Sequence, residues 1–129
     1  MNRARAIFLI HWEMAAYRTA KAASDSAKAW QALERAHILS QPYFGSHFTN
    51  HWSMLCFAFE QRDRREIAGQ IVRLAIAPLG ALTGRIPVGN TGRSNVSAFL
   101  QMPIADDLRR AMEVISECRC RCRYRSRCA

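Results

Sequence analysis

The stretch LERAHILSQPYFGSHFTNHWSML, residues 33–55, contains two helical patterns separated by a short break. Apolar residues recur at helical spacing on both sides of the break. Pro42 and Gly45 are both poor residues for a helix interior, so the break lies within SQPYFGS. A connection this short predicts that the two helices are antiparallel neighbours, and this hairpin decides the fold.

The rest of the chain follows the same pattern. Residues that favour helix are frequent and β-branched runs are scarce, which predicts an all-α fold of four to five helices in one domain, residues 1–117. A long irregular loop at 80–103 is expected to wrap across them. The first expected helix covers 4–24, and the second runs to about Leu39 with Asp25 or Ser26 as turn or N-cap. The third covers about 47–61 with Ser46 as N-cap, and the fourth is capped by Asp63 and ends before Pro78. The last covers about 106–117.

A faint internal repeat supports a hairpin architecture. Shifting the chain by 38 positions places Asp25 on Asp63 and Ala20 on Ala58. Two helix–turn–helix units of similar build are implied, comparable to tetratricopeptide hairpins. The Gly and Tyr residues typical of the tetratricopeptide repeat are absent. The pattern therefore predicts a similar arrangement of helices but not membership of the tetratricopeptide family. Hairpins of this kind offer a surface for a protein partner.

Positive charge is concentrated at one end of the chain. The net charge is +9, and the final segment CRCRCRYRSRCA, residues 118–129, holds five arginines and no acid. The remainder is only mildly basic, so no specific nucleic-acid partner is expected. The tail has four cysteines, and thiolates at this spacing could bind soft ions. Its simple alternation of two residue types favours a disordered tail without function.

Targeting and membrane signals are not evident in the sequence. No run of 18 apolar residues exists, so no transmembrane helix and no membrane partner are expected. The first residues have no cleavage site of a signal peptide, which favours a cytoplasmic protein. Cys56 lies in an apolar pattern and is expected to be buried.

The histidines are the residues most suggestive of chemistry. Glu34 precedes His37 by three positions and His47 precedes His51 by four, and such pairs share one helix face. Glu-x-x-His and His-x-x-x-His are both spacings that suit metal ions in helical proteins. His11 is the remaining histidine and the likeliest extra ligand. These five residues are the predicted metal site.

A site rich in histidine with a carboxylate suits a transition metal ion, with Zn, Fe, Cu and Ni equally compatible. Binding is expected to weaken as pH falls through about 6.5, because protonated imidazole cannot be a ligand. The alternatives are an interaction module in which the histidines are structural, and, more weakly, a small metalloenzyme. No nucleophile with an evident base is present, so an enzyme is the less favoured class.

Two further patterns bear on the site. Phe48, Trp52, Leu55 and Phe59 are expected to form the buried stripe of the helix that carries His51. The segment GRIPVGNTGRSN lacks the Gly-Lys-Ser/Thr ending of a phosphate-binding loop. Its glycines are expected to form tight turns, with Arg85 or Arg93 tying the loop to the helices.

Four segments together resemble a known bacterial family: LERAH, HFTNHWSML, RDRRE and PVGNTGR. They resemble the DUF3703 proteins, small helical proteins of unknown function, over about residues 5–113. Members are often found near heavy-metal resistance genes. The resemblance therefore implies a non-enzymatic, metal-binding accessory to metal homeostasis or resistance, and the cysteine-rich tail lies beyond the family pattern.

Overall fold

The structure is a computed structural model that describes residues 1–83 and 87–113. Its helices are α1 (Arg3–Ala22), α2 (Ser26–Ser40), α3 (Phe44–Glu60), α4 (Arg64–Thr83) and α5 (Asp106–Glu113). This part of the chain contains no strand, so the predicted all-α class is confirmed. None of its helices is long and apolar enough to cross a membrane. The predicted disordered tail and Arg85 lie outside the described residues.

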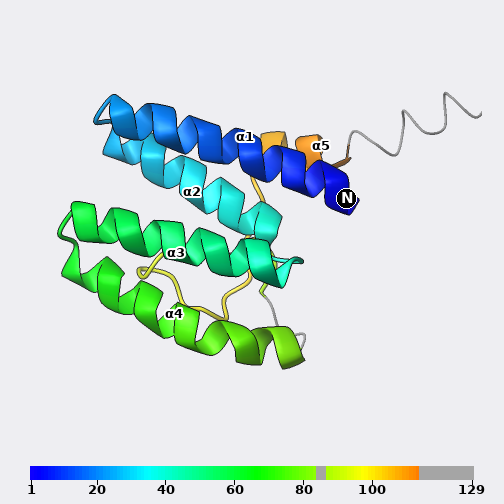
Figure 1. The fold of residues 1–129 in the computed structure, drawn as a ribbon. Helices are drawn as coiled ribbons and strands as arrows, with labels where there is room; N and C mark the ends of the chain where they lie inside the picture. Colours follow the sequence, from blue (N-terminus) through cyan, green and yellow to red (C-terminus); the bar gives the residue numbers. More distant parts are fainter. Residues whose placement is uncertain (84–86, 114–129) are drawn as a thin grey trace, which may run out of the picture.

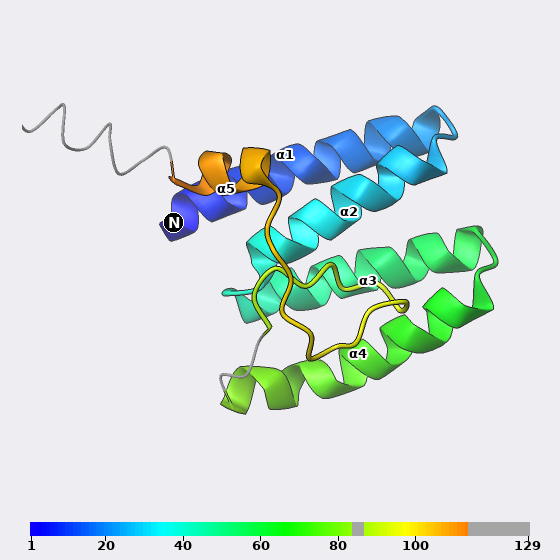
Figure 2. The same ribbon diagram turned by 180° about the vertical axis from the view of Figure 1, so that it is seen from behind.

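The first four helices pack in chain order, each antiparallel to the next. In Figure 1 the α1–α2 hairpin lies beside the α3–α4 hairpin, with α2 against α3 between them. This arrangement is consistent with the predicted tetratricopeptide-like hairpins. Figure 2 shows residues 87–105 running back across the second hairpin before α5 reaches α1. That segment is the wrapping loop expected from the sequence.

The two hairpin turns are built alike, as the repeat of 38 residues predicts. The backbone N–H of Asp25 donates to Ala20 O at 2.9 Å, and that of Asp63 donates to Ala58 O at 3.0 Å. The residue before each aspartate has a positive φ, 56° and 54°. Each aspartate then caps the next helix by accepting a hydrogen bond from the backbone three residues ahead.

Two apolar clusters join α1, α2, α3 and α5. The first joins α1, α2 and α3 around Phe57, whose ring meets Tyr17 edge-on at 5.5 Å and Trp30 at 5.0 Å. The second joins α1 and α2 to α5 through Leu108, which is fully buried. Because α5 has this one buried anchor among its described residues, Leu108 is what docks the end of the wrapping loop.

The predicted boundaries of two helices were wrong. α3 begins at Phe44 rather than 47, because the carbonyl of Tyr43 already accepts from His47 N at 2.9 Å and closes the first turn. Ser46 therefore lies inside the helix and is not its N-cap. α4 continues through Pro78, whose ring is exposed. A proline removes one main-chain donor, and that alone bends a helix more readily than it ends it.

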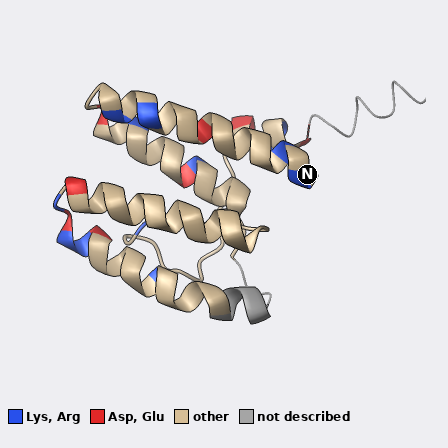
Figure 3. Cartoon of the chain, viewed as in Figure 1, with Lys and Arg blue, Asp and Glu red and all other residues tan. Residues whose placement is uncertain are grey.

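The predicted buried stripe of α3 was wrong in part, because Leu55 is buried but Phe48, Trp52 and Phe59 are exposed. Trp52 and Phe59 are 56% and 57% exposed, and Cys56 is exposed as well. The buried face carries His51 and Met54 instead. The helix has no charged residue before Glu60, as Figure 3 shows, so polarity does not distinguish its inner from its outer face.

Phe57→Ala should lower the free energy of unfolding by about 3–5 kcal/mol, because a large buried ring is lost and a cavity remains. Phe59→Ala is the matched control on the same helix, and its change should stay within about 0.5 kcal/mol. Urea unfolding of the two variants measures both values. If both variants lost the same free energy of unfolding, the face of α3 that carries Phe57 would not be the one packed in the core.

Candidate metal centre

Three histidines meet where the end of α2 approaches the start of α3. His37 lies in the last turn of α2, and His47 and His51 lie one turn apart in α3. Their ring centroids are 4.6, 4.6 and 4.7 Å apart. One ligand atom from each lies within 4.8 Å of the others, which makes this a group that could hold a metal ion.

The wrapping loop determines which nitrogen of His37 carries the proton. Its Nδ1 lies 2.9 Å from the backbone oxygen of Asn90. A carbonyl oxygen only accepts, so Nδ1 must carry the hydrogen and donate it. In the neutral ring, Nε2 is then left with a free lone pair.

Gln70 of α4 determines the tautomer of His51 in the same way. The Gln70 amide nitrogen donates to Glu66 Oε1 and to Gly92 O, both at 2.8 Å. These two acceptors use both amide hydrogens and settle the orientation of the side chain. The remaining Oε1 lies 2.8 Å from His51 Nδ1, which must therefore be the donor. His51 Nε2 is left with a free lone pair as well.

The two Nε2 atoms face each other at 3.2 Å, although neither has a hydrogen to share. Burial lowers the pKa of His37 well below 6.5 and that of His51 to about 4, so no extra proton lies between them at neutral pH. Two facing lone pairs repel unless a cation separates them. Two nitrogens bound to one tetrahedral zinc at about 2.0–2.1 Å are about 3.3–3.4 Å apart, close to the observed spacing.

His47 also has a ring nitrogen without a hydrogen-bond partner among the described residues. Its Nδ1 is buried and makes no hydrogen bond with the described part of the protein. Burial, and then the neighbouring His51, lower its pKa to about 4, so this ring is neutral too. A buried polar atom without a partner is costly. One ring nitrogen of His47 lies within 4.8 Å of ligand atoms of His37 and His51, so this residue suits the role of third metal ligand.

The wrapping loop is itself held by polar contacts behind the histidines. The Asn90 amide nitrogen donates to Ser97 O at 2.8 Å and to Leu100 O at 2.7 Å, and its Oδ1 accepts from Gly92 N at 2.9 Å. Gln41 Nε2 donates to Asn90 O at 3.3 Å. The oxygen that orients His37 is therefore positioned by several bonds at once.

An ion-pair cluster attaches the same loop to α2 and α4. Arg93 Nε lies 3.1 Å from Glu66 Oε2, and its Nη1 lies 3.3 Å from Glu34 Oε1. The guanidinium also lies over the Trp30 ring, 3.8 Å from its centroid. Glu66 accepts further bonds from Ser94, and its hydrogen bonds outweigh burial and lower its pKa. Arg93 therefore ties the loop to the helices, as the sequence predicts for Arg85 or Arg93.

The structure brings three of the five predicted metal-site residues together. His37, His47 and His51 form the group, whereas Glu34 is paired with Arg93 and His11 is exposed on α1. Burial raises the pKa of Glu34, with Arg93 opposing that effect. The i, i+3 spacing places Glu34 near the His37 face, but Arg93 competes with the histidines for its charge.

Sequence reasoning missed the residues that orient the imidazoles, Gln70 and Asn90. Gln70 lies on a helix without a distinctive motif around it. Asn90 lies in PVGNTGR, where the two glycines with positive φ, Gly89 and Gly92, were the available signal. They predict tight turns, but not that a backbone oxygen of the turn faces a histidine.

Gly92→Ala tests the fit between the loop and the site. At φ 78° an alanine is strained, and its Cβ would lie 2.9 Å from three atoms of the His37 ring. We expect a loss of at least about 2 kcal/mol in the free energy of unfolding. Gly45→Ala is the control, because its Cβ would meet nothing within 4 Å and should be neutral or slightly stabilising. Similar effects at both positions would argue against close packing of the loop on His37.

Comparison with known proteins assigns a family but no activity. No curated protein and no solved structure matches the chain. The model of one family, described as a protein of unknown function (DUF3703), matches residues 4–112. That match covers well over half of the chain, so the chain belongs to the DUF3703 family.

Proposed function

We propose that this protein binds one transition-metal ion through His37, His47 and His51, and that it serves metal homeostasis or resistance in the cytoplasm without catalysing a reaction. The observation that carries the proposal is the pair of Nε2 atoms facing each other at 3.2 Å. Their Nδ1 hydrogens are committed to Asn90 O and Gln70 Oε1. A cation between the rings removes the repulsion, and the hydrogen bonds behind them orient the ligands.

The ligand chemistry limits the kind of ion. Three imidazoles suit Zn(II), Cu, Ni(II) or Fe(II), whereas Ca²⁺ and Mg²⁺ need oxygen ligands. The nearest buried acid, Glu66, reaches the triad only through Gln70 and is paired with Arg93. The triad is therefore uncharged, and a fourth position is left for water or an anion from the half-exposed side of His47.

The same geometry favours binding over catalysis. A metalloenzyme needs a group that moves a proton beside the metal-bound water. Glu34 and Glu66 are the carboxylates next to the site, and both are engaged by Arg93. A metal held without a free acid or base nearby suits storage, sensing or transfer, and the metalloenzyme is the weaker alternative.

Metal content separates this proposal from the reading in which the histidines are structural. The protein is purified without a histidine tag, loaded with Zn(II) or Co(II), desalted and subjected to elemental analysis. One ion per chain is expected for the wild type. The His37→Ala/His51→Ala double variant should retain none, because two of three ligands are gone.

The fourth histidine provides the matched control. His11→Ala, on the exposed face of α1, should leave one ion per chain. His47→Ala provides a second test at a half-buried position, and circular dichroism checks that each variant keeps its helices. A wild type that retains no ion, or a folded double variant that retains as much as the wild type, would refute the proposal.

Burial also changes the expected pH dependence. The pKa values of His47 and His51 are lowered to about 4, so protons compete with the metal only near that pH and not near 6.5. The dissociation constant for Zn(II), measured by competition with a chelator of known affinity, should be nearly constant between about pH 7 and 5.5. A steep rise in the dissociation constant below pH 6.5 would instead indicate solvated histidines.

The same shift affects the stability of the metal-free protein, with a definite sign. The unfolded chain takes up protons on histidine near pH 6.5, whereas the folded chain does so only near 4. The free energy of unfolding should therefore fall as pH drops from about 6.5 to about 4, by about 3 kcal/mol for a histidine shifted this far. Urea unfolding at a series of pH values measures how the free energy of unfolding depends on pH. A free energy that stays constant between pH 6.5 and 4 would contradict the prediction.

A further inference from the structure

A groove runs between α1 and α3, on a part of the molecule that the metal centre does not use. Its volume is about 700 Å³, and its lining comes from α1 and from the first half of α3 with Tyr43 before it. Figure 1 shows that these are the first helices of the two hairpins. None of the three clustered histidines lines it.

The charge of the groove has one sign. Its ionisable lining residues include Arg3, His11 and Arg18, and no carboxylate lines it. Within the described part of the chain, Arg3 and Arg18 form no ion pair. Arg35, Arg93 and Arg109, by contrast, are each paired with an acid. The groove is thus complementary to negative charge.

A buried amide in the groove lacks a partner. Asn50 is 3% exposed and lines the groove, and its Oδ1 makes no hydrogen bond within the described structure. Its Nδ2 has only a contact with Met14 Sδ at 4.0 Å, which is weak. An unsatisfied buried amide costs about 1–3 kcal/mol, so its presence needs an explanation. A ligand that pairs with the amide provides one.

The length of the groove points to a chain rather than a small anion. Arg3 and Arg18 are 15 positions apart on one helix, which corresponds to about 22 Å at 1.5 Å per residue. One small carboxylate cannot reach both. An extended peptide of about seven residues spans that distance. Such a peptide also presents backbone N–H and C=O groups that can pair with the Asn50 amide.

We propose that the α1–α3 groove binds an acidic, extended peptide segment of a partner protein, with carboxylates on Arg3 and Arg18 and a backbone amide on Asn50. This inference is independent of the metal proposal, because it uses none of the metal ligands. The chain's own tail is a poor occupant, since residues 118–129 contain five arginines and no acid.

Selection from a random heptapeptide display library tests the class of ligand directly. Sequences with two or more Asp or Glu residues should be enriched on the wild-type protein. The best peptide, labelled with fluorescein, is then compared by fluorescence polarisation with its Asn/Gln counterpart, which should bind at least about tenfold more weakly. No acidic enrichment, equal binding of the two peptides, or complete competition by millimolar free glutamate would overturn the proposal.

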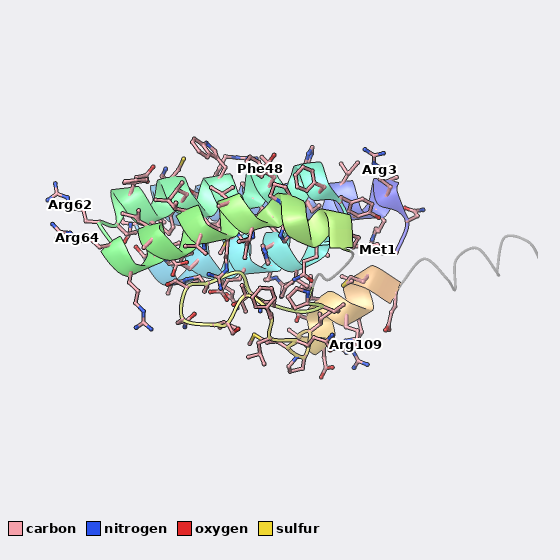
Figure 4. The ribbon with its side chains drawn as sticks, turned by 90° about the horizontal axis from the view of Figure 1, so that it is seen from below. Met1, Arg3, Phe48, Arg62, Arg64 and Arg109 are labelled. Carbon is pink, nitrogen blue, oxygen red and sulfur yellow. The ribbon has the colours of Figure 1, made fainter. Side chains whose placement is uncertain are left out.

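Charge reversal locates the site. The Arg3→Glu/Arg18→Glu double variant should bind the acidic peptide at least about tenfold more weakly than the wild type. Arg64→Glu is the matched control, because Arg64 is exposed at the α3–α4 turn, far from Arg3, as Figure 4 shows. It should change affinity less than about twofold at 0.15 M salt. Equal losses for Arg64→Glu and the groove variant would mean nonspecific attraction to a basic protein.

Asn50→Leu distinguishes a binding role from a structural one. The change replaces an unpartnered amide with an apolar side chain of similar size, so the melting temperature should be equal or higher. Peptide affinity should fall at least about fivefold, because one amide partner is lost. Lower stability with unchanged affinity would show that Asn50 serves the fold and not the groove.

Discussion

The contact between His37 Nε2 and His51 Nε2 is the constraint on which the rest of the structure depends. Both atoms are acceptors, they are buried, and they lie 3.2 Å apart. Such a contact persists only if each ring is held from behind, and Asn90 O and Gln70 Oε1 hold them. A repulsive arrangement supported from both sides is typical of a site prepared for a cation.

This constraint explains why the wrapping loop is part of the site and not a connection alone. The loop supplies the oxygen behind His37, and it is tied to α2 and α4 by Arg93 through Glu34 and Glu66. Metal bound at the triad would therefore stabilise the loop along with the helix ends. Binding and folding are coupled when ligands come from elements that must be assembled.

α3 contributes to two different surfaces, which accounts for its unusual sequence. One face carries His47 and His51 toward His37, and another carries Asn50 toward the groove beside α1. Its remaining surface leaves Trp52 and Phe59 exposed. A helix with apolar or uncharged residues on every side cannot be oriented by its hydrophobic pattern.

The sequence by itself determined the features that depend on neighbouring residues. Helical periodicity, the capping Asp25 and Asp63, and the repeat of 38 positions predicted the hairpins, because these signals act within a few residues of one another. The spacing of His47 and His51 also predicted a shared helix face, and the structure has both in one group. Local chemistry is enough for such features.

Only the tertiary structure decided which of the predicted site residues lie together and which residues orient them. Glu34 has the right spacing from His37 but pairs with Arg93, which is 59 residues away in the chain. Gln70 and Asn90 become partners of the histidines only when α4 and the loop close over α2 and α3. Contacts across such distances depend on packing and on competition between partners, and no periodicity in the sequence records them.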